Sequence, residues 1–187
     1  MDSLAIFCRQ VRARSAEHRL AVARLGPVHT HSTIVGILRQ ELDSTVRVVY
    51  LLSVTDRGRR DELVAASVAG RQWSRPDRGG RVTDREMVEL ADRLNGWTKS
   101  VYSFGCAFIH LSSFHDYASR DPMGMIPENE RAAILDHMRH YHGGPVGDRP
   151  SFDELARFFP SVFDKIASNL ECYLGYLEDG RDLVDGD

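Results

Sequence analysis

The sequence predicts an all-α protein, a single-domain bundle of about six to seven helices. Apolar residues recur at the three- and four-residue spacing of helices along most of the 187 positions. Capping boxes, in which Ser or Thr precedes Glu by three residues, occur at 83–86 and 151–154 and open helices. Neither an alternating strand pattern nor an internal repeat is found. We expect the bundle to span residues 1–178, followed by an acidic, frayed tail at 179–187.

The first two helices are expected at 3–24 and 32–54, each with a one-sided apolar pattern, and Gly26 and Pro27 separate them. The segment 46–52, VRVVYLL, is rich in β-branched residues and could form a strand. It continues the helical spacing without a turn residue, so we assign it to the second helix.

The middle of the chain alternates between helices and breakers. A third helix is predicted at 56–69, and the loop 70–81 follows it because a proline and two adjacent glycines interrupt any regular pattern. The first capping box then opens a helix that runs to about Leu94. Residues 97–117 are the least polar segment and are apolar on more than one face, which predicts a central buried helix.

Two further helices complete the prediction. One begins at Pro127, a residue suited to a first helical turn, and ends at the glycine pair 143–144. The last runs from the capping box at Ser151 to about Glu178 and is interrupted at Pro160.

Composition narrows the functional classes. Apolar residues make up 42% of the chain and charged residues 27%, as in ordinary globular proteins. The three cysteines form no CxxC pair, so neither a zinc ribbon nor a thioredoxin-type site is indicated. A glycine-rich phosphate loop, a GxSxG elbow and an HExxH motif are also missing. Without a secretory signal pattern or a long apolar run, we expect a cytoplasmic protein that does not enter a membrane.

Charge is divided unevenly along the chain. Residues 1–82 carry 14 Arg against 8 Asp and Glu, whereas residues 83–187 carry 10 Lys and Arg against 19 Asp and Glu. The basic half could face phosphate groups. Alternatively, the two halves could pack on each other or across a dimer, which is the simpler reading.

The predicted central helix carries polar groups that need partners. His110 and His115 lie in it together with tyrosines and serines, including Tyr117. Buried groups of this kind either form a structural hydrogen-bond network or serve as an acid–base pair. Spacing alone favours the structural network.

A second histidine cluster comprises His137, His140 and His142. The first two are neighbours on a helix and could share a metal. All three fall in a helix's last turn, where imidazoles complement the helix dipole. We therefore interpret them as C-terminal capping residues and predict no metal.

The loop 70–81 contains a candidate RNA-binding set. Arginines interleave with an indole in the way that single-stranded RNA recognition uses them. A solvated loop explains the same residues. The set is Arg71, Trp73, Arg75, Arg78 and Arg81.

Two segments resemble HEPN-like (higher eukaryotes and prokaryotes nucleotide-binding) proteins of bacterial abortive-infection or toxin type. They are STIVGILRQELDSTVRVVYLL, residues 32–52, and VYSFGCAFIHLSSFHDY, residues 101–117. The resemblance implies a helical bundle, often dimeric, without a cofactor. Some such proteins are metal-independent ribonucleases of toxin–antitoxin, phage-defence and CRISPR systems, and others lack activity. The implied partners are RNA, a cognate antitoxin or sensor protein, and a second copy in a homodimer.

The resemblance also suggests a catalytic set. Active members carry an Arg and a later His with four to six residues between them, and four such pairs occur here, where roughly three are expected by chance. None of them precedes the two histidines of the central helix. We hypothesise that Arg39 and Glu41 supply the missing groups to His110, His115 and Tyr117 in a metal-independent endoribonuclease. The alternative is a non-catalytic helical module that binds a partner protein or a nucleotide.

Overall fold

Helices account for all the regular secondary structure in the described part of the chain, which confirms the all-α prediction. The structure is a computed structural model that describes residues 2–28, 30–75, 79–116 and 119–183. The α-helices are α1 Ser3–Leu25, α2 His31–Ser53, α3 Arg57–Val68, α4 Asp84–Asn95, α5 Thr98–Ile109, α6 Glu128–His142, α7 Phe152–Ala156 and α8 Phe159–Glu178. Three short 3-10 helices, η1 Gly26–Val28, η2 Ser113–His115 and η3 Pro122–Gly124, lie between them.

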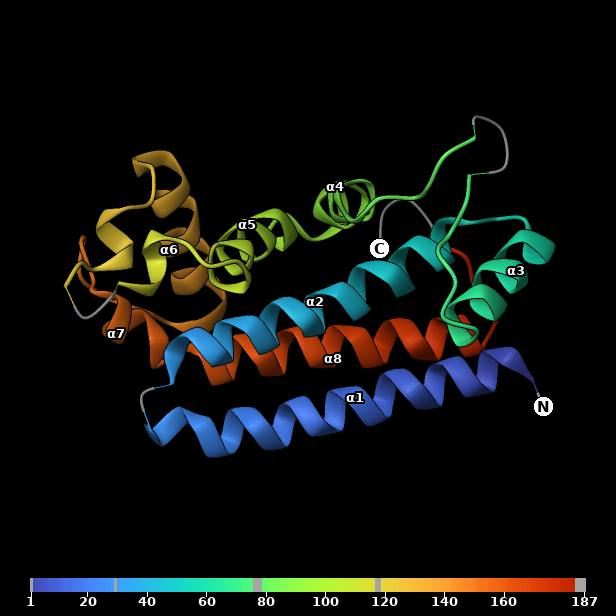
Figure 1. Ribbon diagram of the computed structural model, residues 1–187, viewed down its shortest axis with the longest axis horizontal. Coiled ribbons are helices and arrows are strands. Elements are labelled where there is room, and N and C mark those ends of the chain that lie inside the picture. Colours follow the sequence, from blue (N-terminus) through green and yellow to red (C-terminus); the bar gives the residue numbers. More distant parts are fainter. Residues whose placement is uncertain (1, 29, 76–78, 117–118, 184–187) are drawn as a thin grey trace.

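Three long helices, α1, α2 and α8, lie side by side and form the base of the molecule (Figure 1). Ion pairs fix the direction of α1 against α8, because Arg12 contacts Glu171 and Glu178 whereas Arg19 contacts Asp164. Residue numbers rise on one helix as they fall on the other, so α1 and α8 are antiparallel. Helices α1 and α2 are also antiparallel, and α2 therefore runs parallel to α8.

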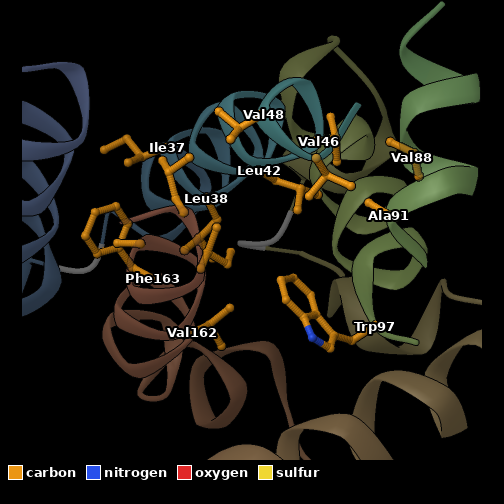
Figure 2. Close-up of a cluster of buried hydrophobic side chains, with 14 of the residues drawn as sticks. Ile37, Leu38, Leu42, Val46, Val48, Val88, Ala91, Trp97, Val162 and Phe163 are labelled. Carbon is orange, nitrogen blue, oxygen red and sulfur yellow. The ribbon is translucent and has the colours of Figure 1, made fainter. Parts of the chain in front are cut away.

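Helix α2 is covered on opposite sides, by α1 and α8 below and by α4 and α5 above (Figure 1). Figure 2 shows Leu42 and Val46 of α2 near Val88 and Ala91 of α4, with Trp97 beside them. This coverage on two sides explains why six of the seven residues of VRVVYLL are apolar, and the one charged residue among them, Arg47, is partly exposed. The assignment of 46–52 to a helix is confirmed.

The predicted helix over 97–117 is wrong in its second half. Helix α5 ends at Ile109, and His110 has extended backbone angles of φ −97° and ψ 141°. The Ser112 hydroxyl donates to the Ala107 carbonyl at 2.7 Å and accepts from the Phe114 amide at 3.2 Å. Serine thus replaces the helical hydrogen bonds at this point and starts the short turn η2.

Both predicted capping boxes are present. Thr83 and Glu86 exchange hydrogen bonds at the start of α4, and Ser151 and Glu154 do so at the start of α7. The predicted interruption near Pro160 separates α7 from α8, and this proline occupies the first turn of α8. That division brings the count to eight α-helices among the described residues, one above the expected range.

The predicted tail begins with residues that contact the bundle. The Leu183 amide donates to the Leu52 carbonyl at 2.9 Å, and the buried Arg60 contacts Asp182 and the Arg181 carbonyl. Residues 184–187 lie outside the described residues. None of the described helices has the combination of length and apolarity that a bilayer crossing needs.

Candidate functional site

Glu41, one of the predicted catalytic residues, lies in a sealed polar cluster between α1 and α2. Its side chain is 0% exposed, and one carboxyl oxygen lies 2.7 Å from Nδ1 of His18. The Ser15 hydroxyl donates to the other carboxyl oxygen. Because both carboxyl oxygens are occupied and solvent is excluded, the cluster holds the two helices together rather than facing a substrate.

Arg39, the second predicted partner, points towards α5. Its side chain is 8% exposed, and the guanidinium carbon lies 4.0 Å from the centre of the Tyr102 ring. Asp84 is 3.7 Å from the same guanidinium. Burial raises the pKa of the Tyr102 phenol, and the nearby Arg39 offsets part of that rise. Arg39 therefore clamps α2 against α5 through a stacked cation.

The two histidines of the catalytic hypothesis lie beyond the end of α5. His110 is exposed at the helix C-cap, and the His115 ring packs edge-on against Phe108 with centroids 6.0 Å apart. Within the described ranges, no hydrogen bond, ion pair or ring contact joins either imidazole to Arg39 or Glu41. The described members of the expected group therefore do not lie together. Tyr117 lies outside the described residues.

The predicted RNA-binding loop is largely engaged with the fold. Trp73 is only 4% exposed, and its indole N–H donates to the Leu63 carbonyl and the Ser67 hydroxyl, each at 2.9 Å. Its ring also stacks on Tyr50 with centroids 5.6 Å apart. The expectation that this indole stacks on an RNA base is thus wrong, because the loop folds back and buries it.

The loop arginines have different environments. Arg75 forms an ion pair with Glu86 at 2.6 Å, which raises the pKa of Arg75 and lowers that of Glu86. Arg81 is exposed and pairs through its backbone with Ser74. Arg78 falls outside the described residues. Arg71 lies at a concave surface together with arginines from other elements.

That surface is a cleft of about 280 Å³ where α1, α2 and the end of α3 meet, which we name the arginine cleft. Three guanidinium groups and a single carboxyl group line it, together with neutral polar and apolar side chains. The lining residues are Phe7, Gln10, Val11, Arg14, Asp43, Ser44, Arg47, Ser67 and Arg71.

Hydrogen bonds to neighbouring side chains hold two of the three guanidinium groups in place. Arg14 donates to the Ser44 hydroxyl at 3.3 Å. Arg47 donates to Asp43 at 3.1 Å and to Asp84 at 3.3 Å. Arg71 makes no side-chain hydrogen bond or ion pair with any residue that the structure describes. The cleft thus combines two positioned cations and one uncommitted cation, an arrangement suited to oxyanions.

Sequence reasoning found Arg71 but missed the rest of the arginine cleft and the buried cluster. A signal for the cluster was present, because Ser15 and His18 occupy the same helical stripe as Val11 and Val22. Polar residues on the buried stripe of a helix indicate a buried partner on the neighbouring helix. No comparable signal joins Arg14, Arg47 and Arg71, which come from three separate elements.

The histidines of α6 form no metal site in the structure. Across the described ranges, no group of three or more His, Cys, Asp or Glu side chains is placed to hold a metal ion. His142 instead contacts the Ser161 hydroxyl at 2.9 Å. Helix α6 ends at His142, and its C-cap Gly143 has a φ of 74°, the left-handed conformation that often ends a helix. Burial and the neighbouring Lys165 lower the pKa of His142.

Comparisons with protein-family models, with curated proteins and with solved structures gave no match. The likeness to HEPN-like proteins therefore rests on the residues of 32–52 and 101–117 alone.

Proposed function

We propose that this protein is a non-catalytic RNA-binding module of the HEPN-like defence or toxin type, which holds the RNA backbone in the arginine cleft. The observation that carries the proposal is the convergence of Arg14, Arg47 and Arg71. Asp43 is the one carboxyl group in the described lining, and Asp84 binds Arg47 from outside the cleft. Guanidinium groups bind phosphate through paired N–H donors, and phosphate contacts supply most of the affinity for RNA without reading its sequence.

The volume and lining of the cleft favour a single strand of RNA over a small molecule. Its volume of about 280 Å³ lies slightly below the range of roughly 300–1,000 Å³ that encloses small molecules. The lining contains no aromatic platform other than Phe7 among the described residues, so base stacking has little part here. Backbone phosphates of single-stranded RNA are the ligand that fits three spaced cations.

Binding without cleavage is the form that the geometry supports. In the described part of the chain, no imidazole lines the arginine cleft, and the buried His18 is engaged by Glu41. A histidine able to take the proton of the ribose 2′-hydroxyl is thus lacking at this site. From the resemblance to HEPN-like proteins, we also propose that the protein forms a homodimer and binds a cognate antitoxin or sensor protein.

The proposal is tested by fluorescence anisotropy with a labelled single-stranded RNA titrated at several salt concentrations. Three phosphate contacts predict a slope of log K against log salt of about −2, at about −0.7 per contact. Arg71→Gln is expected to weaken binding and to reduce the slope by about 0.7. This residue is chosen because its removal breaks no described ion pair. The matched control is Arg157→Gln, an exposed arginine at the end of α7, which should leave binding unchanged.

Two results would contradict the proposal: no binding at low salt, or equal losses for the Arg71 and Arg157 variants. RNA integrity is measured in the same samples. Cleavage by the purified protein that disappears in a His110→Ala/His115→Ala double variant would replace binding by ribonuclease activity as the function.

A further inference from the structure

The carboxyl group in the arginine cleft does not suit a site that binds phosphate alone. Asp43 lies on α2 and lines the cleft together with Arg14, Arg47 and Arg71. A carboxylate repels a phosphate group at short range, so its presence among the three guanidinium groups weakens phosphate binding. A ligand group that donates a hydrogen bond would instead be attracted to this position.

Holding Arg47 does not use the whole carboxylate of Asp43. One oxygen, Oδ2, accepts from Nε of Arg47 at 3.1 Å. The other, Oδ1, accepts no hydrogen bond from any described residue, and the Arg39 nitrogen beside it is 3.9 Å away, beyond hydrogen-bond distance. The side chain of Asp43 is 21% exposed, so it is open to solvent. Because an ionised carboxylate has about four lone-pair sites, Asp43 keeps free acceptor capacity.

The other polar side chains that line the cleft are weaker acceptors. The Ser44 hydroxyl already accepts from Arg14 at 3.3 Å, and the Ser67 hydroxyl accepts from an indole N–H at 2.9 Å. Gln10 is exposed and neutral. Hydrogen bonds to an ionised acceptor are roughly twice as strong as those between neutral groups. A donor on the ligand therefore finds its best partner in the carboxylate of Asp43.

The ribose of RNA carries a donor at the matching place. The 2′-hydroxyl is bound to the carbon next to the one that bears the 3′ phosphate, and DNA lacks this hydroxyl. A group that contacts it must therefore lie beside the cations that hold the phosphate. Oδ2 of Asp43 meets this condition, since it lies 3.1 Å from Arg47 and 3.9 Å from Arg14.

We propose that Asp43 accepts a hydrogen bond from a ribose 2′-hydroxyl while Arg14 and Arg47 hold the adjoining phosphate, so that the arginine cleft prefers RNA to DNA. This inference rests on the proposed function and adds the group that distinguishes the two nucleic acids. Phosphate contacts alone are made equally by both. With DNA, the carboxylate gains no donor and still repels the phosphate.

The test is fluorescence anisotropy of the whole protein with labelled oligouridylate, oligodeoxyuridylate and 2′-O-methyl oligouridylate of equal length. These probes share their base and differ only at the 2′ position. The RNA is expected to bind about tenfold more tightly than the DNA, because hydrogen bonds to charged groups are among the stronger ones. The 2′-O-methyl RNA cannot donate and should bind no more tightly than the DNA.

Variants separate direct contact by Asp43 from its effect on Arg47. Asp43→Ala should weaken RNA binding and strengthen DNA binding, which brings the ratio of the two affinities close to one. Asp43→Asn keeps an uncharged acceptor and should give an intermediate ratio. The salt slope for RNA should not change in Asp43→Ala, because Asp84 still holds Arg47 at 3.3 Å. The matched control is Asp61→Ala, an exposed carboxyl group on α3, which should keep the full preference.

Several results would overturn this inference. They are equal binding of RNA and DNA by the unaltered protein, tight binding of the 2′-O-methyl RNA, or a full RNA preference in Asp43→Ala. A reduced salt slope in Asp43→Ala would also do so, because Asp43 would then act by positioning Arg47. Equal binding of RNA and DNA leaves the proposed function intact, whereas binding of none of the three probes contradicts both.

Discussion

The buried cluster between α1 and α2 gives the most quantitative prediction. Replacing His18 by Ala removes the 2.7 Å contact to Glu41, a side chain that is 0% exposed and cannot turn to water. Breaking a buried pair of this kind costs about 3 to 5 kcal/mol. Because the Ser15 hydroxyl still donates to the same carboxyl group, we expect the lower end, about 3 kcal/mol. For a chain of this length, that loss lowers Tm by about 6 to 12 °C.

The measurement is thermal and urea unfolding of His18→Ala followed by circular dichroism at 222 nm. Glu17→Ala is the control, since Glu17 is the preceding residue on α1 but is exposed. In a double variant, His18→Leu/Glu41→Leu, both partners become apolar, and we expect most of the lost stability to return. A His18→Ala protein as stable as Glu17→Ala, or a double variant less stable than His18→Ala, would refute the reasoning.

Three further predictions concern other parts of the fold. A Cβ added at Gly105 would lie 2.7 Å from Cβ of Arg39, so Gly105→Ala should lower the free energy of unfolding by about 1 to 2 kcal/mol in urea melts, despite the better helix propensity of alanine. Trp73→Phe removes two indole hydrogen bonds and should cost about 1 to 3 kcal/mol, yet leave RNA affinity unchanged, because the indole is buried; a loss of affinity in anisotropy assays at full folding would contradict this. Burial raises the pKa of the Cys8 thiol to about 11, so this thiol should resist alkylation at pH 8.5 while the exposed Cys172 reacts. Since the folded-state pKa of Cys8 lies above the unfolded value, its contribution to stability is complete below about pH 9 and falls as the pH rises towards 11, which urea midpoints at pH 8 and pH 10.5 will show.

The fold was predictable where local chemistry and packing agree. Both capping boxes open helices as expected, and the segment 46–52 is helical despite its β-branched residues, because α2 is buried on opposite sides. The prediction for 97–117 was wrong past Ile109, since apolar residues cannot reveal that the Ser112 side chain replaces helical hydrogen bonds. A single serine here outweighs the hydrophobic pattern around it.

The candidate site was less predictable because it depends on which helix faces which. Arg39 and Glu41 are two residues apart, so they point about 200° apart around α2, one towards α5 and the other towards α1. Sequence spacing alone could not assign these faces. In the same way, Trp73 was expected at the surface of a polar loop, and only the packing of that loop against Tyr50 and α3 buries it.

The parallel pairing of α2 with α8 has a consequence for how the chain folds during synthesis. Residues 54–158 lie between these two helices in the sequence. Helix α8, which packs on α2, therefore leaves the ribosome only after all of these residues have been made. At translation rates of about 5 to 20 residues per second, the apolar side of α2 waits roughly 5 to 20 s for α8. Until α8 is made, α1 is the one other long helix of the base that can cover α2, and the Glu41 cluster joins the two. A nascent chain stalled before residue 159 should therefore recruit chaperones, and one extended past residue 178 should release them.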